Sequence, residues 1–268
     1  MYYEALFELN EFLLEEEIKW NNLENSLILT EASIVLNEEE EMKDSDLADK
    51  VETVIKNFGS WLKGLFDKVM GFFSDFFNNV EEIFKGIKRA FTDNSITIAM
   101  ERNSDWKKIS VAIPDTRAIT NRLVSNQINL RDPKGLRVME ETLNKVPMIQ
   151  LQAVVKNIGN LKALINSTTK AKNYVLSLRN TVKKELVQAN NDLKSFEKGS
   201  EDAQNISKEI NEKKVLLMKL VKLSARFANI VRSQYMTIFK FIRRIGKNKE
   251  TKSKYTDLER ETGKTKKY

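Results

Sequence analysis

Hydrophobic and polar residues follow a helical period over most of this chain. From Asp46 to Phe91, apolar residues recur at steps of three and four for about forty residues. Two later stripes, over residues 151–196 and 206–245, follow a near-heptad repeat and are separated by the short break "EKGSED". Two long amphipathic patterns joined by a short loop predict an antiparallel helical hairpin.

One segment has a different period. In "SITIAMERNSDWKKISVAIPD", Ile96, Ile98 and Met100 alternate with other residues in the first run, and a second alternating run ends before Pro114. The turn residues "RNSD" lie between the two runs. This pattern predicts a β-hairpin. The predicted fold class is therefore mainly α: a long antiparallel helical hairpin with amphipathic helices and one small β-hairpin.

Changes in composition divide the chain into five segments. Four glycines lie within residues 44–92. Each lowers the stability of a helix interior by about 1 kcal/mol, so we expect a kink, a break or a close helix contact there. The sequence "FNN" at 77–79 predicts a split into two helices. The segments are an acidic leader and linker (1–43, with a short helix at about 3–20), an aromatic-rich amphipathic segment (44–92), a β-hairpin and short helix (93–133), the long helical hairpin (134–246) and a basic tail without fixed structure (247–268).

Charge is segregated along the chain, which has a formal net charge of +7. Residues 1–52 contain 16 acidic and 3 basic residues, whereas residues 99–268 contain 17 acidic and 36 basic residues. Solvated helix faces explain either sign alone, but they do not explain the separation. The separation indicates two surfaces with different partners.

The composition excludes much of the chemistry of enzymes. The chain has no histidine and no cysteine, so His bases, thiolate nucleophiles, disulfides and thiolate zinc sites are excluded. No Gly-rich phosphate loop or serine-nucleophile motif is present. Carboxylates lie in solvated runs such as Glu38–Glu41. We therefore expect no catalytic site, no metal and no cofactor.

Aromatic residues are concentrated in the 44–92 segment. They have two interpretations: a helix that fills a core or subunit contact, or a surface that seeks a membrane. The mixed charges of the polar face, with Lys56, Lys63 and Asp67, favour the first. The candidate residues for a membrane or partner helix are Trp61, Phe66, Phe72, Phe73, Phe76 and Phe77.

The basic C-terminal region is a candidate for sequence-independent nucleic-acid binding through phosphates, with a solvated tail as the alternative. The densest cluster comprises Arg243, Arg244, Lys247, Lys249, Lys252 and Lys254. The hairpin register predicts that further cations point outward and extend this surface. These are Lys213, Lys214, Lys219, Lys222, Arg226 and Arg232.

A short motif in the leader carries a resemblance to a known family. The sequence "LTEA", in which Leu29, Glu31 and Ala32 are the defining residues, resembles the cleavage signal of the prohead proteases of large tailed bacteriophages. Other Leu-x-Glu sequences occur in the leader, but only Glu31 is followed by a small residue. Cleavage after Glu31 would remove 8 acidic and 1 basic residue and raise the net charge from +7 to +14.

The resemblance implies an internal head protein whose leader targets it into the assembling capsid. On this interpretation the protein is a non-enzymatic virion protein, made in the bacterial cytoplasm, located inside the head or ejected with the genome. Its expected partners are other virion proteins, non-specific DNA and further copies of itself.

Two alternatives stay open. One is a membrane-active protein, pore-forming or ejection-related, that acts through residues 51–91. The other is a bacterial coiled-coil adaptor whose leader docks on the basic arms. No run of about 18 apolar residues occurs, so a spanning helix is not expected, and the acidic start is unlike a secretory signal.

Overall fold

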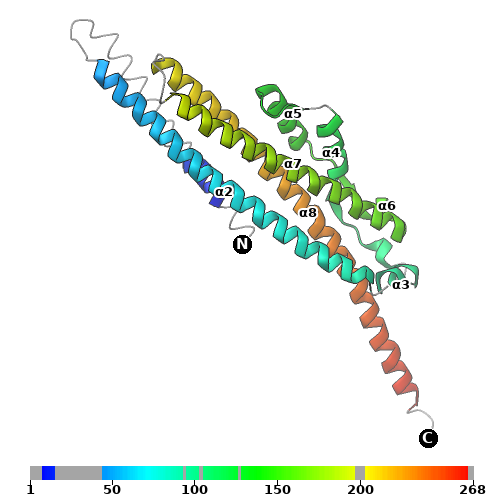
Figure 1. Cartoon of the computed structure of the whole chain (residues 1–268). Coiled ribbons are helices and arrows are strands. Elements are labelled where there is room, and N and C mark those ends of the chain that lie inside the picture. Colours follow the sequence, from blue (N-terminus) through cyan, green and yellow to red (C-terminus); the bar gives the residue numbers. More distant parts are fainter. Residues whose placement is uncertain are drawn as a thin grey trace. The chain divides into compact units, whose positions relative to one another are not determined.

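The structure is a computed structural model that describes residues 8–15, 44–92, 95–102, 105–125, 128–196 and 203–264. Side chains are described from Glu52 in the first long helix and up to Gly246 in the last. The elements after residues 8–15, which are helical, are α2 (Asp44–Thr92), α3 (Ser95–Arg102), the 3-10 helix η1 (Asp105–Lys108), β1 (Ala112–Pro114), α4 (Thr116–Ser125), α5 (Pro133–Asn144), β2 (Met148–Gln150), α6 (Leu151–Val154), α7 (Ile158–Phe196) and α8 (Ala203–Lys264) (Figure 1).

The predicted fold class is confirmed. The described chain is mainly helical, its two long helices α7 and α8 are antiparallel, and it contains a two-stranded antiparallel sheet. The chain divides into two compact units. Unit 1 comprises Met1–Asp75, Ile128–Glu140 and Leu176–Arg226, and unit 2 comprises Phe76–Gln127, Glu141–Val175 and Phe227–Tyr268.

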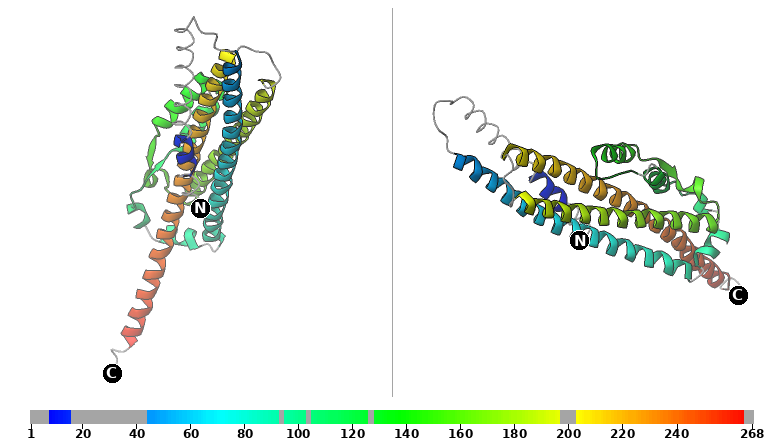
Figure 2. Two further views of the ribbon diagram at one scale, coloured as in Figure 1. Left: turned by 90° about the vertical axis from the view of Figure 1, so that its left-hand side faces the viewer. Right: turned by 45° about the horizontal axis from the view of Figure 1, so that its top comes forward.

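Unit 1 is built on segments of α2, α7 and α8 that lie side by side (Figure 2). Asp192 of α7 pairs with Lys213 of α8, and Leu193 of α7 approaches Gly59 of α2. The apolar stripes of the three segments are buried because each helix presents one apolar face to the other two. The largest side chains of this core include Phe58, Leu65, Phe72 and Phe73.

The helix at residues 8–15 docks on α2 within unit 1. Leu9 and Leu13 are 0% and 1% exposed, and Lys68 forms a 2.8 Å salt bridge with Glu8. A Cβ atom at Gly64 would lie 3.1 Å from the ring of Phe12. The absence of a side chain at residue 64 therefore allows the leader helix to approach α2 closely.

Unit 2 contains the remaining segments of the same three helices, together with α3, α4, α6 and the sheet. Thr169 of α7 hydrogen-bonds Tyr235 of α8, and further along α7 the ring of Tyr174 packs against Phe227, which is earlier in α8. This order shows that the two helices are antiparallel. Burial raises the pKa of Tyr235; the hydrogen bond with Thr169 opposes this rise, and the charge of Glu81 adds to it. The phenol is therefore neutral at physiological pH.

Helix α2 is continuous, so the split predicted at 77–79 is wrong. Within the helix, the side-chain oxygen of Asn79 accepts a 2.7 Å hydrogen bond from Arg232 of α8. The predicted close helix contact is present: a Cβ atom at Gly86 would lie 2.8 Å from the Phe239 ring. Gly59, Gly64 and Gly86 thus allow close packing, and no glycine ends the helix.

The location predicted for the β-hairpin is wrong: of its second strand only the end is a strand, in β1, and Asp105–Lys108 is the 3-10 helix η1. β1 pairs with β2, which follows α5, in the register Ala112↔Gln150 and Pro114↔Met148. The first predicted strand is helix α3. Ile96, Ala99 and Met100 are buried there, and their spacing of three and four residues places them on one helix face.

Two other expectations fall partly outside the described residues. The leader helix predicted over about 3–20 is observed for residues 8–15. The sequence predicts a basic tail without fixed structure, but helix α8 continues to Lys264 (Figure 1). The predicted hairpin segment 134–246 also contains α5, β2 and α6 before the arm α7 begins at Ile158.

Candidate functional site

The aromatic candidates of α2 lie mainly in the interior. Trp61, Phe72, Phe73 and Phe76 are no more than 3% exposed, and Phe66 and Phe77 are half-buried. A bilayer could reach the four buried rings only if the helix packing opened. Among the described residues, no helix is long and apolar enough to cross a membrane.

The basic candidates lie in helix α8 of unit 2. Arg243 and Arg244 are exposed. The backbone at Lys247, Lys249, Lys252 and Lys254 continues the helix, and their side chains are outside the described part of the structure. Leu29, Glu31 and Ala32 of the cleavage motif also lie outside the described residues.

Two helix faces of unit 2 carry exposed cations at the same level of the helical bundle. On α2 these are Lys85, Lys88 and Arg89, and on α8 they are Lys240, Arg243 and Arg244. Steps of three and four residues place each trio on a single face. The contact between Gly86 of α2 and Phe239 of α8 fixes the common level. Unit 2 contains 25 basic and 11 acidic residues, a net charge of +14.

Two of these cations lie over aromatic rings. The Arg243 guanidinium is 5.8 Å from the ring centroid of Phe239, and the Lys88 ammonium is 5.3 Å from that of Phe84. A ring attracts a cation but carries no opposite charge. These contacts orient the side chains and leave their net charge available to an anion.

The prediction that all the cations of the α8 arm point outward is wrong for two residues. Lys214 is 2% exposed, and its ammonium lies 5.2 Å from the ring centroid of Trp61 in unit 1. Arg232 is 6% exposed and donates its hydrogen bond to Asn79 in unit 2. Both belong to the packing of their own units and do not extend the exposed basic surface.

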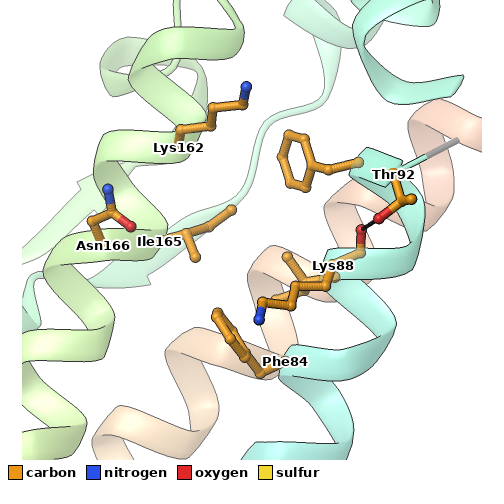
Figure 3. A pocket seen from close by; sticks show the side chains of 8 residues that line it. Phe84, Lys88, Thr92, Lys162, Ile165 and Asn166 are labelled. Carbon is orange, nitrogen blue, oxygen red and sulfur yellow. Dashed lines mark hydrogen bonds between the residues drawn. The ribbon is translucent and has the colours of Figure 1, made fainter. Parts of the chain in front are cut away.

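A pocket of about 510 Å³ lies between α2 and α7 in unit 2 (Figure 3). Its apolar wall includes Phe84 and Ile165, and its polar groups include Lys88, Lys162 and Asn166. The side chains of Lys88 and Lys162 come from opposite helices (Figure 3). No carboxylate is among the described residues that line it. Its electrostatic potential therefore favours an anion.

Sequence reasoning missed this pocket. Lys88 could have been noticed from the spacing of Lys85, Lys88 and Arg89 along one helix face. Lys162 could not, because it is a single lysine in an ordinary helical pattern, and only the packing of α7 on α2 brings it near Phe91. Within the described ranges, no group of three acidic, cysteine or histidine residues could hold a metal ion.

Comparisons with known proteins found no relative. No protein-family model, curated protein or solved structure matches this chain. The candidate function therefore rests on the chemistry of the residues themselves.

Proposed function

We propose that this protein is a non-enzymatic structural protein of a tailed-phage virion, internal to the head or ejected with the genome, and that unit 2 lies against DNA. The observation that supports this most is the exposed cationic faces of unit 2, on α2 and α8. The charge plan and the LTEA motif of the leader agree with it.

The exposed cations suit DNA because a duplex carries a dense, regular array of phosphates. Each lysine or arginine that neutralises a phosphate releases a bound counterion, so the affinity does not depend on sequence and falls steeply with salt. Each of the two cationic faces can contact phosphates of a duplex. Such binding needs no catalytic group and no cofactor.

The acidic leader has a role in the same proposal. Removal of residues 1–31 would raise the net charge to +14, and a more positive body associates faster and more strongly with a polyanion. The intact mass of the protein isolated from its source tests this step. A chain that starts at Ala32 supports processing, and a chain that starts at Met1 counts against it.

The test of DNA contact is the salt dependence of binding to a short duplex by the full chain. In the triple variant Lys240→Ala, Arg243→Ala, Arg244→Ala, we expect the slope of log affinity against log salt to fall by about 0.9 for each phosphate that the variant no longer neutralises. The matched control is Lys183→Ala, Lys184→Ala, Lys194→Ala, which removes three exposed lysines of α7 in unit 1.

The control is expected to keep most of the affinity and of the slope, although both triples lower the net charge by the same amount. Equal losses in the two triples would show that net charge alone is responsible, and would overturn the assignment of the surface to unit 2. No measurable duplex binding by the wild-type chain would overturn the DNA proposal itself.

A further inference from the structure

The pocket between α2 and α7 combines two features. The first is a pair of ammonium groups from different helices, Lys88 and Lys162. The second is an aromatic wall: the Lys162 ammonium is 5.8 Å from the ring centroid of Phe91, and the Lys88 ammonium is 5.3 Å from that of Phe84. Both rings are half-buried, so each presents part of its surface to the pocket.

The positive charge of this pocket is not neutralised by neighbouring acids. Among the described residues, no carboxylate forms an ion pair with Lys88 or Lys162. Lys172 adds a third cation near the Phe84 ring, at 6.0 Å from its centroid, and its contact with Glu81 is long at 3.9 Å. A ligand with a negative group and a flat apolar body satisfies both the lysines and the rings.

We propose that this pocket binds one nucleotide of a single-stranded nucleic acid. Its phosphate binds the Lys162 ammonium group and its base packs against Phe91, while Lys88 adds positive charge at the other end of the pocket (Figure 3). The Asn166 amide lies on the α7 wall, where it can hydrogen-bond the edge of a base. An aromatic platform beside a basic groove is the general mode of single-strand binding. This inference rests on the proposed function, because it adds a subsite to a surface that already attracts phosphates.

A single strand fits better than a duplex for a geometric reason. The bases of a duplex are stacked inside the helix, so they cannot reach a ring in a pocket, whereas an unstacked base can. The volume of about 510 Å³ admits a ligand the size of one nucleotide.

The experiment compares the binding of a labelled oligothymidylate with that of a duplex of the same length, for the full chain and its variants. Phe91→Leu keeps an apolar side chain and removes the aromatic face, and we expect about tenfold weaker binding of the single strand. Duplex binding, which depends on Lys240, Arg243 and Arg244, is expected to change less than about twofold. A pocket variant with unchanged single-strand affinity and normal thermal unfolding would overturn the proposal.

A lysine pair provides the second variant and its control. Lys162→Gln is expected to weaken oligothymidylate binding at low salt more than Lys170→Gln does, although each removes one exposed lysine of α7 in the same unit. Equal effects would mean that the pocket is not the site. Because duplex binding is measured in parallel, failure of the pocket is distinguishable from failure of the DNA proposal, in which both affinities are absent.

Ultraviolet cross-linking tests the contact without a substitution. After cross-linking to oligothymidylate, the tryptic peptide that spans residues 90–102 should carry the nucleotide, and Phe91 is its only aromatic residue. Adducts confined to other peptides would overturn the assignment. Phe91-dependent binding to phosphatidylglycerol vesicles without any to the oligonucleotide would also overturn it, in favour of a lipid. If thymidine monophosphate competes fully and the oligonucleotide binds no more tightly than it does, the single-strand proposal is overturned in favour of a free nucleotide.

Discussion

Units 1 and 2 accommodate their basic side chains in different ways. Among the described residues, the basic groups of unit 1 mostly meet carboxylates, as in the pairs of Lys68 with Glu8 and Lys219 with Glu140, although Lys214 lies over Trp61. Those of unit 2 mostly lie over rings, as Arg243 does over Phe239, although Lys172 is 3.9 Å from Glu81. Unit 1 contains 20 basic and 27 acidic residues, whereas unit 2 contains 25 and 11.

The difference has a physical consequence for binding. A carboxylate cancels the charge of its partner at distances beyond the pair, but an aromatic ring does not. Helices with similar apolar stripes therefore present two surfaces of opposite character. Unit 2 carries the larger excess of positive charge that phosphates can neutralise, and this is why we propose the DNA contact there.

The largest expected effects concern the core of each unit, because both cores contain buried aromatic side chains. Phe72 of unit 1 and Phe227 of unit 2 are 1% and 0% exposed, so replacing either with alanine should lower the free energy of unfolding by about 3–5 kcal/mol. Urea denaturation measures this. Val215→Ala, at a residue 57% exposed, is the control and should change stability by less than about 0.5 kcal/mol. A stabilising Phe72→Ala would instead support a membrane-seeking face in unit 1.

The next effect concerns the acidic leader helix of unit 1. In Gly64→Leu, the new side chain occupies the place of Phe12, so we expect residues 8–15 to detach and their amides to exchange hydrogen near the rate of an unfolded peptide. Exposure of the buried Leu9 and Leu13 makes the change cost about 3 kcal/mol or more. Hydrogen exchange with peptide mapping measures it.

Gly71→Leu is the matched control for that experiment. A Cβ atom at Gly71 has no neighbour within 4 Å, so the helix-favouring change should leave residues 8–15 protected and stabilise the protein slightly. Similar exchange of residues 8–15 in both variants would contradict the docking on Gly64.

The smallest effect is the pH dependence of one ion pair in unit 1. Burial acts to raise the pKa of Asp192, but hydrogen bonds from Lys213 and Gln188, with the charge of Lys213, outweigh it and hold the pKa below its usual value. A lowered folded-state pKa gives stability that is present above the unfolded pKa of about 3.9 and is lost as the pH falls through the folded value.

Asp192→Asn should therefore destabilise the protein at neutral pH, and the effect should shrink at low pH, as the pH falls through the folded-state pKa and Asp192 becomes neutral like the asparagine. Unfolding in urea at a series of pH values measures the difference. Glu52→Gln, in the exposed pair with Lys56, is the control and should have little effect at either pH. A constant cost of Asp192→Asn at all pH values would contradict the origin of the shift.

The long helices could be predicted from the sequence because apolar residues recur in them at helical spacing over many turns. The hairpin of α7 and α8 and the core position of Phe72 and Phe76 follow from apolar steps of three and four. Short segments were less predictable. The run 95–102 fits both a strand and a helix, since eight residues sample each period only briefly, and burial of Ile96 and Met100 within unit 2 selects the helix.

Long-range pairing was not predictable from the sequence. Pro114 of β1 and Met148 of β2 face each other although they are 34 positions apart, and no local pattern marks Met148–Gln150 as a partner strand. The pocket was also missed, because Lys162 and Phe91 come from different helices. The excess of basic residues in α8 could be counted from the sequence. The inward position of Lys214 and Arg232 could not be predicted, because it depends on the rotation of α8 against its neighbours.

The contacts of α2 with α8 in unit 2 also restrict how the chain can change in length. Asn79 meets Arg232 and Gly86 meets Phe239, and the partners are 153 positions apart in both pairs. The register between α2 and α8 is therefore constant over this stretch. Deleting one residue between 79 and 86 would turn the following part of α2 by about 100° and place a side chain where the ring of Phe239 now fits. In this part of the molecule, insertions and deletions should be tolerated only as matched changes in both helices.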